Sequence, residues 1–154
     1  MLQFDSTPTA ALYSNAAVLF KEYALWLGID LQFQNFDSEL VTLPTVYGPP
    51  NGAIILGWFN GECVACVAIR GISNGIAELK RMYVKPACQE KGVGTQLLKQ
   101  ALTMAKDLGY KSIKLDTLSH MQNAIRLYEK NGFERTNAYY HNPNKSAVYM
   151  EKLL

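Results

Sequence analysis

The chain has 154 residues, of which 49% are hydrophobic and 18% are charged, and its formal net charge is +2. This length predicts a single domain, residues 1–154, that buries a core without disulfides, and the hydrophobic content excludes a disordered chain. With so small a net charge and no long basic run, nothing indicates a protein that binds nucleic acid or a membrane surface.

Three cysteines, an odd number, are typical of a reducing compartment, and the N-terminus lacks the pattern of a signal peptide. Together these features predict a cytoplasmic protein. Cys63 and Cys66 form a C-x-x-C, which is also found in metal and redox sites. Because residues three apart on a strand point to opposite faces, we expect two packed side chains and no metal site.

The first half of the chain predicts a long helix followed by an antiparallel meander. The expected elements are a short edge strand at 2–4, helices over 9–27 and 38–43, and strands over 53–59, 62–70 and 76–84. Apolar residues at helical spacing define the first helix, and Gly28 stands where it ends. Ser38 is the expected cap of the second helix. Asn60-Gly61 is a strong hairpin signal between two of the strands.

The second half predicts alternating helices and strands. The expected elements are a helix over 92–108, a strand over 111–118, a helix from a Ser119 cap to Lys130, and strands over 133–140 and 146–153. The whole order predicts an α/β (α+β) fold, with a mixed, mostly antiparallel central sheet and helices on both faces.

The join between the strand 76–84 and the helix 92–108 is the strongest chemical signal. The strand runs into a glycine-containing loop, and the loop opens the helix. The first N–H groups of a helix lack internal partners and carry partial positive charge, so such an end binds phosphate. Glycines let a ligand approach the backbone closely. By spacing alone, an ordinary strand–turn–helix remains an equal alternative.

This loop, Gln89-x-x-Gly92-x-Gly94, resembles motif A of the GNAT superfamily of N-acetyltransferases. The preceding segment 81–86, Arg-Met-Tyr-Val-Lys-Pro, is similar to the strand that leads into that motif. The later segment 124–133, Ala-Ile-Arg-Leu-Tyr-Glu-Lys-Asn-Gly-Phe, resembles motif B. The order of elements also matches over nearly the whole chain.

The resemblance implies the GNAT acyl-CoA N-acyltransferase fold and an enzyme that moves the acetyl group of acetyl-CoA directly to an amine. The acceptor is a small molecule, a peptide or a protein amine. The residues implied to bind the cosubstrate are Met82, Tyr83, Val84, Gln89, Glu90, Lys91, Gly92, Val93, Gly94, Thr95, Asn123 and Tyr128. The backbone of the strand would hold the pantetheine arm, and the loop amides would hold the pyrophosphate.

Two catalytic roles follow from the resemblance. Tyr128 would be the general acid that protonates the leaving thiolate, the alternative being a core aromatic residue. Glu78 would be the general base for the amine, the alternative being an ion pair with a Lys or Arg of a neighbouring strand. The family motif often has an asparagine where this chain has Met121, so Asn123 is the candidate substitute for that contact with CoA, the alternative being that the contact is absent.

Residues near the expected acceptor entrance are less informative. His120 is read as a surface residue, and the aromatic segment 139–143 could shape an acceptor pocket with Glu22, Tyr23 and Trp26 or simply pack at its rim. A catalytically silent acyl-CoA-binding module is the rival interpretation, but it would need neither catalytic side chain. The partners expected are acetyl-CoA and an amine, with no metal, no nucleic acid and no membrane, and a homodimer is one option for the oligomeric state.

Overall fold

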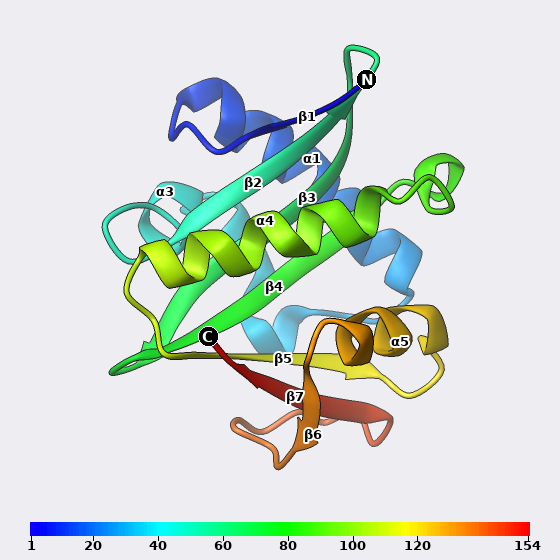
Figure 1. Cartoon of the computed structure of the whole chain (residues 1–154). Helices are drawn as coiled ribbons and strands as arrows, with labels where there is room; N and C mark the ends of the chain where they lie inside the picture. Colours follow the sequence, from blue (N-terminus) through cyan, green and yellow to red (C-terminus); the bar gives the residue numbers. More distant parts are fainter.

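The computed structural model describes residues 1–154, which form a seven-stranded sheet in the order β1-β2-β3-β4-β5-β7-β6 (Figure 1). The strands are β1 (Leu2–Asp5), β2 (Ala53–Phe59), β3 (Glu62–Ser73), β4 (Ile76–Val84), β5 (Ser112–Leu118), β6 (Glu134–Thr136) and β7 (Ala147–Leu153). The helices are α1 (Ala10–Leu27), α2 (Phe36–Leu40), α3 (Leu43–Val46), α4 (Val93–Asp107) and α5 (Gln122–Lys130), with 3-10 turns η1 (Gln32–Gln34) and η2 (Pro86–Cys88). Only the β4–β5 pairing is parallel. The predicted fold class is confirmed.

Two hydrophobic clusters cover the two faces of the sheet. One contains 21 buried residues and joins α4 and α5 to one face. The other contains 13 buried residues and joins α1, α2 and α3 to the opposite face. Figure 1 shows α4 crossing the front of the sheet, with α1 and α3 behind it. Burial of an apolar stripe on each face holds the helices in place, as expected for a sheet covered on both sides.

The first helix and the hairpin follow their local sequence signals. The Thr9 side chain accepts a hydrogen bond of 3.2 Å from the Leu12 N–H and so caps α1. The helix ends at Gly28, whose φ of 75° is left-handed. Asn60 and Gly61 both have positive φ, as a two-residue hairpin turn requires. No helix of the structure has the length and apolar character needed to cross a membrane.

Strands β4 and β5 separate soon after they start. They pair over only three residues on each strand, and the last pair is Glu78 with Lys114. Figure 1 shows β4 and β5 diverging toward their C-terminal ends. The remaining part of β4 therefore has an edge without a neighbouring strand, although β4 lies in the interior of the sheet.

A bulge in β4 lies beside this opening. Ala68 of β3 faces Lys80, but the next partner pair is Cys66 with Tyr83, so β4 contains one extra residue. Arg81 has a φ of 57°, which is costly for a residue with a side chain. The bulge changes the strand's alternation, and both Lys80 and Tyr83 consequently lie on the face that α1 covers.

Several predicted boundaries were wrong, including the end of the strand expected over 62–70, which continues to Ser73. The short helix begins at Phe36 rather than after Ser38, because Phe36 is buried against the α1 face. The last helix begins at Gln122, and Ser119 does not cap it. The strand expected over 133–140 stops at Thr136, because the next side chains turn inward to hydrogen bonds instead of continuing the ladder.

The prediction that the two cysteines of the C-x-x-C point to opposite faces of the sheet was wrong. Cys66 is buried in the α1-face cluster, and Cys63 packs against the same cluster. A register shift between β2 and β3 leaves Val64, which lies between the two cysteines, without a partner residue. This extra residue puts Cys63 and Cys66 on the same side of the sheet. Burial raises the pKa of both thiols, to about 11 for Cys63, so neither is an activated nucleophile.

Candidate active site

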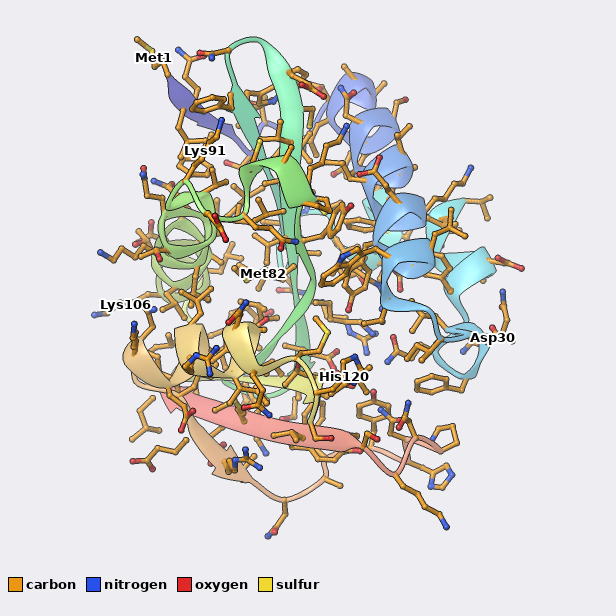
Figure 2. The ribbon with its side chains drawn as sticks, turned by 90° about the vertical axis from the view of Figure 1, so that its right-hand side faces the viewer. Met1, Asp30, Met82, Lys91, Lys106 and His120 are labelled. Carbon is orange, nitrogen blue, oxygen red and sulfur yellow. The ribbon has the colours of Figure 1, made fainter.

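A cavity of about 860 Å³ lies where β4 and β5 separate. Its walls come from β4, β5, the end of α1, the η1 turn and the starts of α4 and α5. Figure 2 looks into this opening: Met82 of β4 lies between α4 and α1, and His120 lies near the start of α5. The cavity therefore has one end under α4 and α5 and another under α1.

The α4 end of the cavity has the backbone geometry of a phosphate-binding site, called here the α4 cradle. Gly92 has a φ of 75° and stands just before α4, whose first turn has no side-chain cap. The N–H groups of Val93, Gly94 and Thr95 donate to no acceptor within the protein. Free helix N–H groups bind anions, and α4 is long enough to carry a full dipole.

The glycines of this loop leave room for a ligand. A Cβ added to Gly92 would meet no atom within 4 Å, and one added to Gly94 would reach only ordinary contact with Leu127 at 3.5 Å. Both glycines line the cavity, together with Gln89, Glu90 and Thr95. The Gln89 side chain donates to the Val84 carbonyl oxygen at 2.9 Å and so fixes the loop to the end of β4.

Other residues of the predicted cofactor set face elsewhere. The Lys91 ammonium lies 5.0 Å from the centre of the Phe59 ring, and the Val93 side chain is fully buried in the core. Neither side chain lines the cavity. Met82, Tyr83 and Val84 do line it, through their positions on the unpaired part of β4.

The two residues proposed from α5 both reach the cavity. Asn123 lines it, although its side-chain oxygen accepts a hydrogen bond from Arg126, and Met121 lines it too. Tyr128 is only 7% exposed, and its hydroxyl has a single weak partner, the Met82 sulfur at 3.9 Å. Burial raises the pKa of Tyr128, and the nearby charge of Asp116 adds to the effect. The phenol is therefore protonated at neutral pH.

Glu78 forms an ion pair with an arginine of the neighbouring strand, which was the alternative to its role as general base. Its carboxylate pairs with the Arg70 Nε at 2.7 Å and accepts a hydrogen bond from the Tyr139 hydroxyl at 2.7 Å. Glu78 is 1% exposed, and it does not line the cavity. A carboxylate with both oxygens engaged and no opening to the cavity is poorly placed to take a proton from an acceptor.

Asp116 is a cavity residue that sequence reasoning missed. It stands on β5, and its carboxylate accepts hydrogen bonds from the Tyr140 hydroxyl at 2.7 Å and from Asn142 at 3.2 Å. Burial raises its pKa, and the Tyr140 hydrogen bond and the charge of Lys80 oppose that rise. Nothing in the local sequence distinguishes it from a solvent-facing strand residue, because its partners come from a distant loop.

Lys80 is a second missed residue. It lines the cavity, is 8% exposed, and its ammonium has one hydrogen-bond partner, the Gln34 side-chain oxygen at 3.3 Å. Burial, together with the charge of Arg81, lowers its pKa from 10.5 to about 8. The alternation of Ala77 and Leu79 with Glu78 and Lys80 was the available signal, because it places two charges on one face of a central strand.

Some of the residues expected near the acceptor line the cavity. Tyr23 and Trp26 of α1 line the cavity, as does Asn142 from the 139–143 segment. Glu22 does not line it; its carboxylate accepts a hydrogen bond of 3.0 Å from the Tyr83 hydroxyl instead. His120, predicted to be a surface residue, is exposed and stands at the cavity's edge.

The model of the acetyltransferase (GNAT) family matches residues 18–133 of the chain. An uncharacterised N-acetyltransferase of Schizosaccharomyces pombe is 40% identical over 135 residues, 86% of this chain and 83% of that protein. A GNAT-family acetyltransferase from Staphylococcus aureus, 17% identical, covers 99% of both chains with a TM-score of 0.81. PaiA N-acetyltransferase from Thermoplasma acidophilum, crystallised with coenzyme A, is 17% identical, covers 100% of this chain and 99% of its own, and has a TM-score of 0.75.

The fold is that of the acyl-CoA N-acyltransferases. The family match and the 40% identical relative show that the chain belongs to the GNAT family of acetyltransferases. Acetyl transfer from acetyl-CoA is the activity of this family.

Proposed function

We propose that this chain transfers the acetyl group of acetyl-CoA directly to an amine. The observation that carries the proposal is that one cavity contains both the free N–H groups at the start of α4 and the Tyr128 hydroxyl. Acetyl-CoA supplies an activated thioester carbonyl. In the balanced reaction, an N–C bond forms and the C–S bond breaks, and the acceptor ammonium loses two protons, one to sulfur and one to solvent.

The chain's own atoms fit the two parts of CoA nearest the thioester. The free N–H groups of Gly94 and Thr95, two residues that line the cavity, offer partial positive charge to a pyrophosphate. The unpaired edge of β4 at Met82 and Val84 offers backbone groups to the amides of a pantetheine arm. The relative from Thermoplasma acidophilum, which has this fold, was crystallised with coenzyme A and supports this assignment.

Tyr128 is the proposed proton donor to the leaving sulfur. Its hydroxyl has no strong partner, so it is available to a ligand, and its raised pKa keeps it protonated. A thiol has a pKa of about 8.5, so full transfer from a phenol of raised pKa is uphill. The main effect of the phenol is therefore a hydrogen bond that stabilises developing negative charge on sulfur, followed by protonation.

Asp116 is the better-placed group for the acceptor amine. An amine is mostly protonated at neutral pH and must lose a proton before it reacts. Asp116 lines the cavity and its raised pKa makes it a stronger base than an ordinary carboxylate. Glu78 keeps its proposed role only if a water chain reaches it, because Arg70 and Tyr139 occupy its oxygens.

The catalytically silent module is the second candidate. It would use the α4 cradle for CoA and would have no need for a buried phenol with an unoccupied hydroxyl beside it. Tyr128 therefore favours the enzyme. The cytoplasmic location and the homodimer option remain predictions.

Two measurements on the purified chain test the proposal. Acetyl-CoA at a hundredfold excess over its Kd should stabilise the folded state by about 2.7 kcal/mol, which a thermal shift titration detects. Release of free thiol with a panel of amines should then exceed the rate without amine. Thermal stabilisation without any amine-dependent thiol release would support the silent module, and a flat titration to millimolar acetyl-CoA would contradict both candidates.

A further inference from the structure

Two opposite charges face the acceptor end of the cavity without pairing. Lys80 of β4 and Asp116 of β5 both line the cavity, and neither makes an ion pair within 4.0 Å with any group of the protein. Lys80 is 8% exposed, and its only partner is the neutral Gln34 side chain. Asp116 accepts only neutral donors, from Tyr140 and Asn142.

The neighbouring charges are compensated. Arg81, the other basic residue of the cavity wall, pairs with Glu39 through two hydrogen bonds of 2.8 Å. Arg70 pairs with Glu78, and Lys114 pairs with Glu151. Buried charges are normally paired, so one unpaired cation and one unpaired anion in the same cavity are an exception that a ligand would explain.

The register between β4 and β5 explains why Lys80 and Asp116 line the same cavity. Glu78 and Lys114 form the last backbone pair between β4 and β5. Lys80 and Asp116 each come two residues later, so strand alternation places both on the α1 face at the point where the strands separate. Both side chains line the cavity there, and they form no ion pair with each other within 4.0 Å.

The rest of this end is apolar. Tyr23, Trp26 and Leu27 of α1 line it, and Ile29, Leu31 and Phe33 of the following segment continue the wall. Such a wall fits an apolar or aromatic group and offers no partner for a further charge.

We propose that the acceptor is a zwitterionic amino acid whose carboxylate binds Lys80, whose amine lies at Asp116, and whose apolar side chain packs against α1. This assignment rests on the proposed acetyl transfer. One molecule of this class satisfies both unpaired charges and the apolar wall at once. It also puts the amine beside the carboxylate that accepts its proton, while the second proton of the ammonium leaves with the departing thiol.

The decisive comparison pairs each acceptor with its decarboxylated counterpart. We would measure kcat/KM by thiol release for the apolar amino acids and for the amines that lack only the carboxylate, such as leucine against 3-methylbutylamine. The amino acids should react about 10- to 100-fold better, the range for one charged hydrogen bond. If every amine reacts as well as its amino acid, the proposal is wrong although acetyl transfer stands.

The variant Lys80→Met tests the residue itself. Methionine keeps the length of the side chain and removes the charge, so kcat/KM should fall about 10- to 100-fold more with the amino acid than with the amine, and the preference for the amino acid should disappear. Lys99→Met, on the exposed face of α4, is the matched control and should keep the preference. An equal fall with both acceptors would show that Lys80 is structural and would overturn its assignment.

A binding measurement separates recognition from turnover. Calorimetry with leucine in the presence of CoA should give a Kd that weakens about 10- to 100-fold in Lys80→Met and is unchanged in Lys99→Met. Unchanged affinity in Lys80→Met would contradict the proposal. Absence of thiol release with every amino acid and every amine would instead count against the proposed function, so the two failures are distinguishable.

Discussion

Glu78 and Arg70 form an ion pair of 2.7 Å between neighbouring strands, with the carboxylate almost fully buried. They are partners in the β3–β4 register, so the hairpin itself brings them together. Tyr139 closes the remaining side of the carboxylate with a hydrogen bond of 2.7 Å. Both partners of the Glu78 carboxylate, Arg70 and Tyr139, are thus side chains that stabilise the folded protein.

Glu78→Gln should therefore lower stability and leave the acetyl-transfer rate within about 3-fold of the wild type. The variant leaves Arg70 without its counter-charge and disturbs a buried hydrogen bond, at a cost of about 1–3 kcal/mol. Denaturant unfolding and thiol release measure the two effects. A large rate defect that shrinks as pH rises, with stability unchanged, would restore Glu78 as the general base.

Tyr128→Phe should reduce turnover by about 10²–10⁴ and leave the affinity for CoA nearly unchanged, because only the hydroxyl is removed. Since the pKa of Tyr128 is raised, the donor stays protonated below its ordinary value of about 10. The defect should therefore be the same from neutral pH to about pH 9. Tyr13→Phe, on α1 and outside the cavity, is the control. Full activity in Tyr128→Phe would remove the residue from the mechanism.

Gly94→Val should weaken CoA binding while the protein still folds. The added branches would enter the cavity beside the free N–H groups of α4, and the first carbon meets Leu127 at an ordinary 3.5 Å. Gly92 is a poorer site for this test, because its φ of 75° makes any β-branched residue strained by about 1–2 kcal/mol. Calorimetry with CoA and a thermal melt measure the two quantities. Unchanged affinity in a folded Gly94→Val would show that the loop is only structural.

Lys80→Met should stabilise the ligand-free protein. Burial, with the charge of Arg81, lowers the pKa of Lys80 from 10.5 to about 8, so the folded state disfavours the ammonium by about 3 kcal/mol at any pH where both the folded and the unfolded chain are protonated. That cost is fully present below about pH 8. Between about pH 8 and 10.5 the unfolded chain binds a proton that the folded chain does not, so the wild type gains stability as pH rises.

The difference between Lys80→Met and the wild type should therefore shrink across that pH window. Chemical denaturation at pH 7 and pH 10 measures it, with Lys99→Met as the control that shows no such trend. A variant less stable than the wild type at pH 7 would mean that the Gln34 hydrogen bond outweighs the cost of burying the charge.

Glu39→Gln should cost about 3–5 kcal/mol, because it leaves Arg81 as a buried cation without its carboxylate. The side chains of this pair are 3% and 6% exposed. Glu62→Gln breaks a pair with Lys85 in which Glu62 is 68% exposed, and it should change stability by less than about 1 kcal/mol. Equal effects of the two substitutions, measured by denaturant unfolding, would show that the Arg81–Glu39 pair carries no special share of the stability.

Much of the fold was predictable from local patterns. The apolar stripe of the first helix, its end at Gly28, the Asn60-Gly61 hairpin and the sheet class are all confirmed. The errors arose where distant contacts override local signals. The burial of Phe36 moved the start of a short helix, and the inward hydrogen bonds of Tyr139 and Tyr140 ended a strand early.

The sequence by itself determined the α4 cradle, since a strand, a glycine loop and a helix start are contiguous and their backbone geometry is local. Tertiary structure alone decided the chemistry at the acceptor end. Glu78 became an ion-pair partner because the hairpin register brought Arg70 to it. Lys80 and Asp116 became cavity residues because β4 and β5 pair in parallel for three residues and then separate. Alternation along β4 could indicate that Lys80 is a charge on a central strand, but a strand's own sequence contains no record of where its neighbour leaves it, so no local pattern could place Lys80 and Asp116 in one cavity.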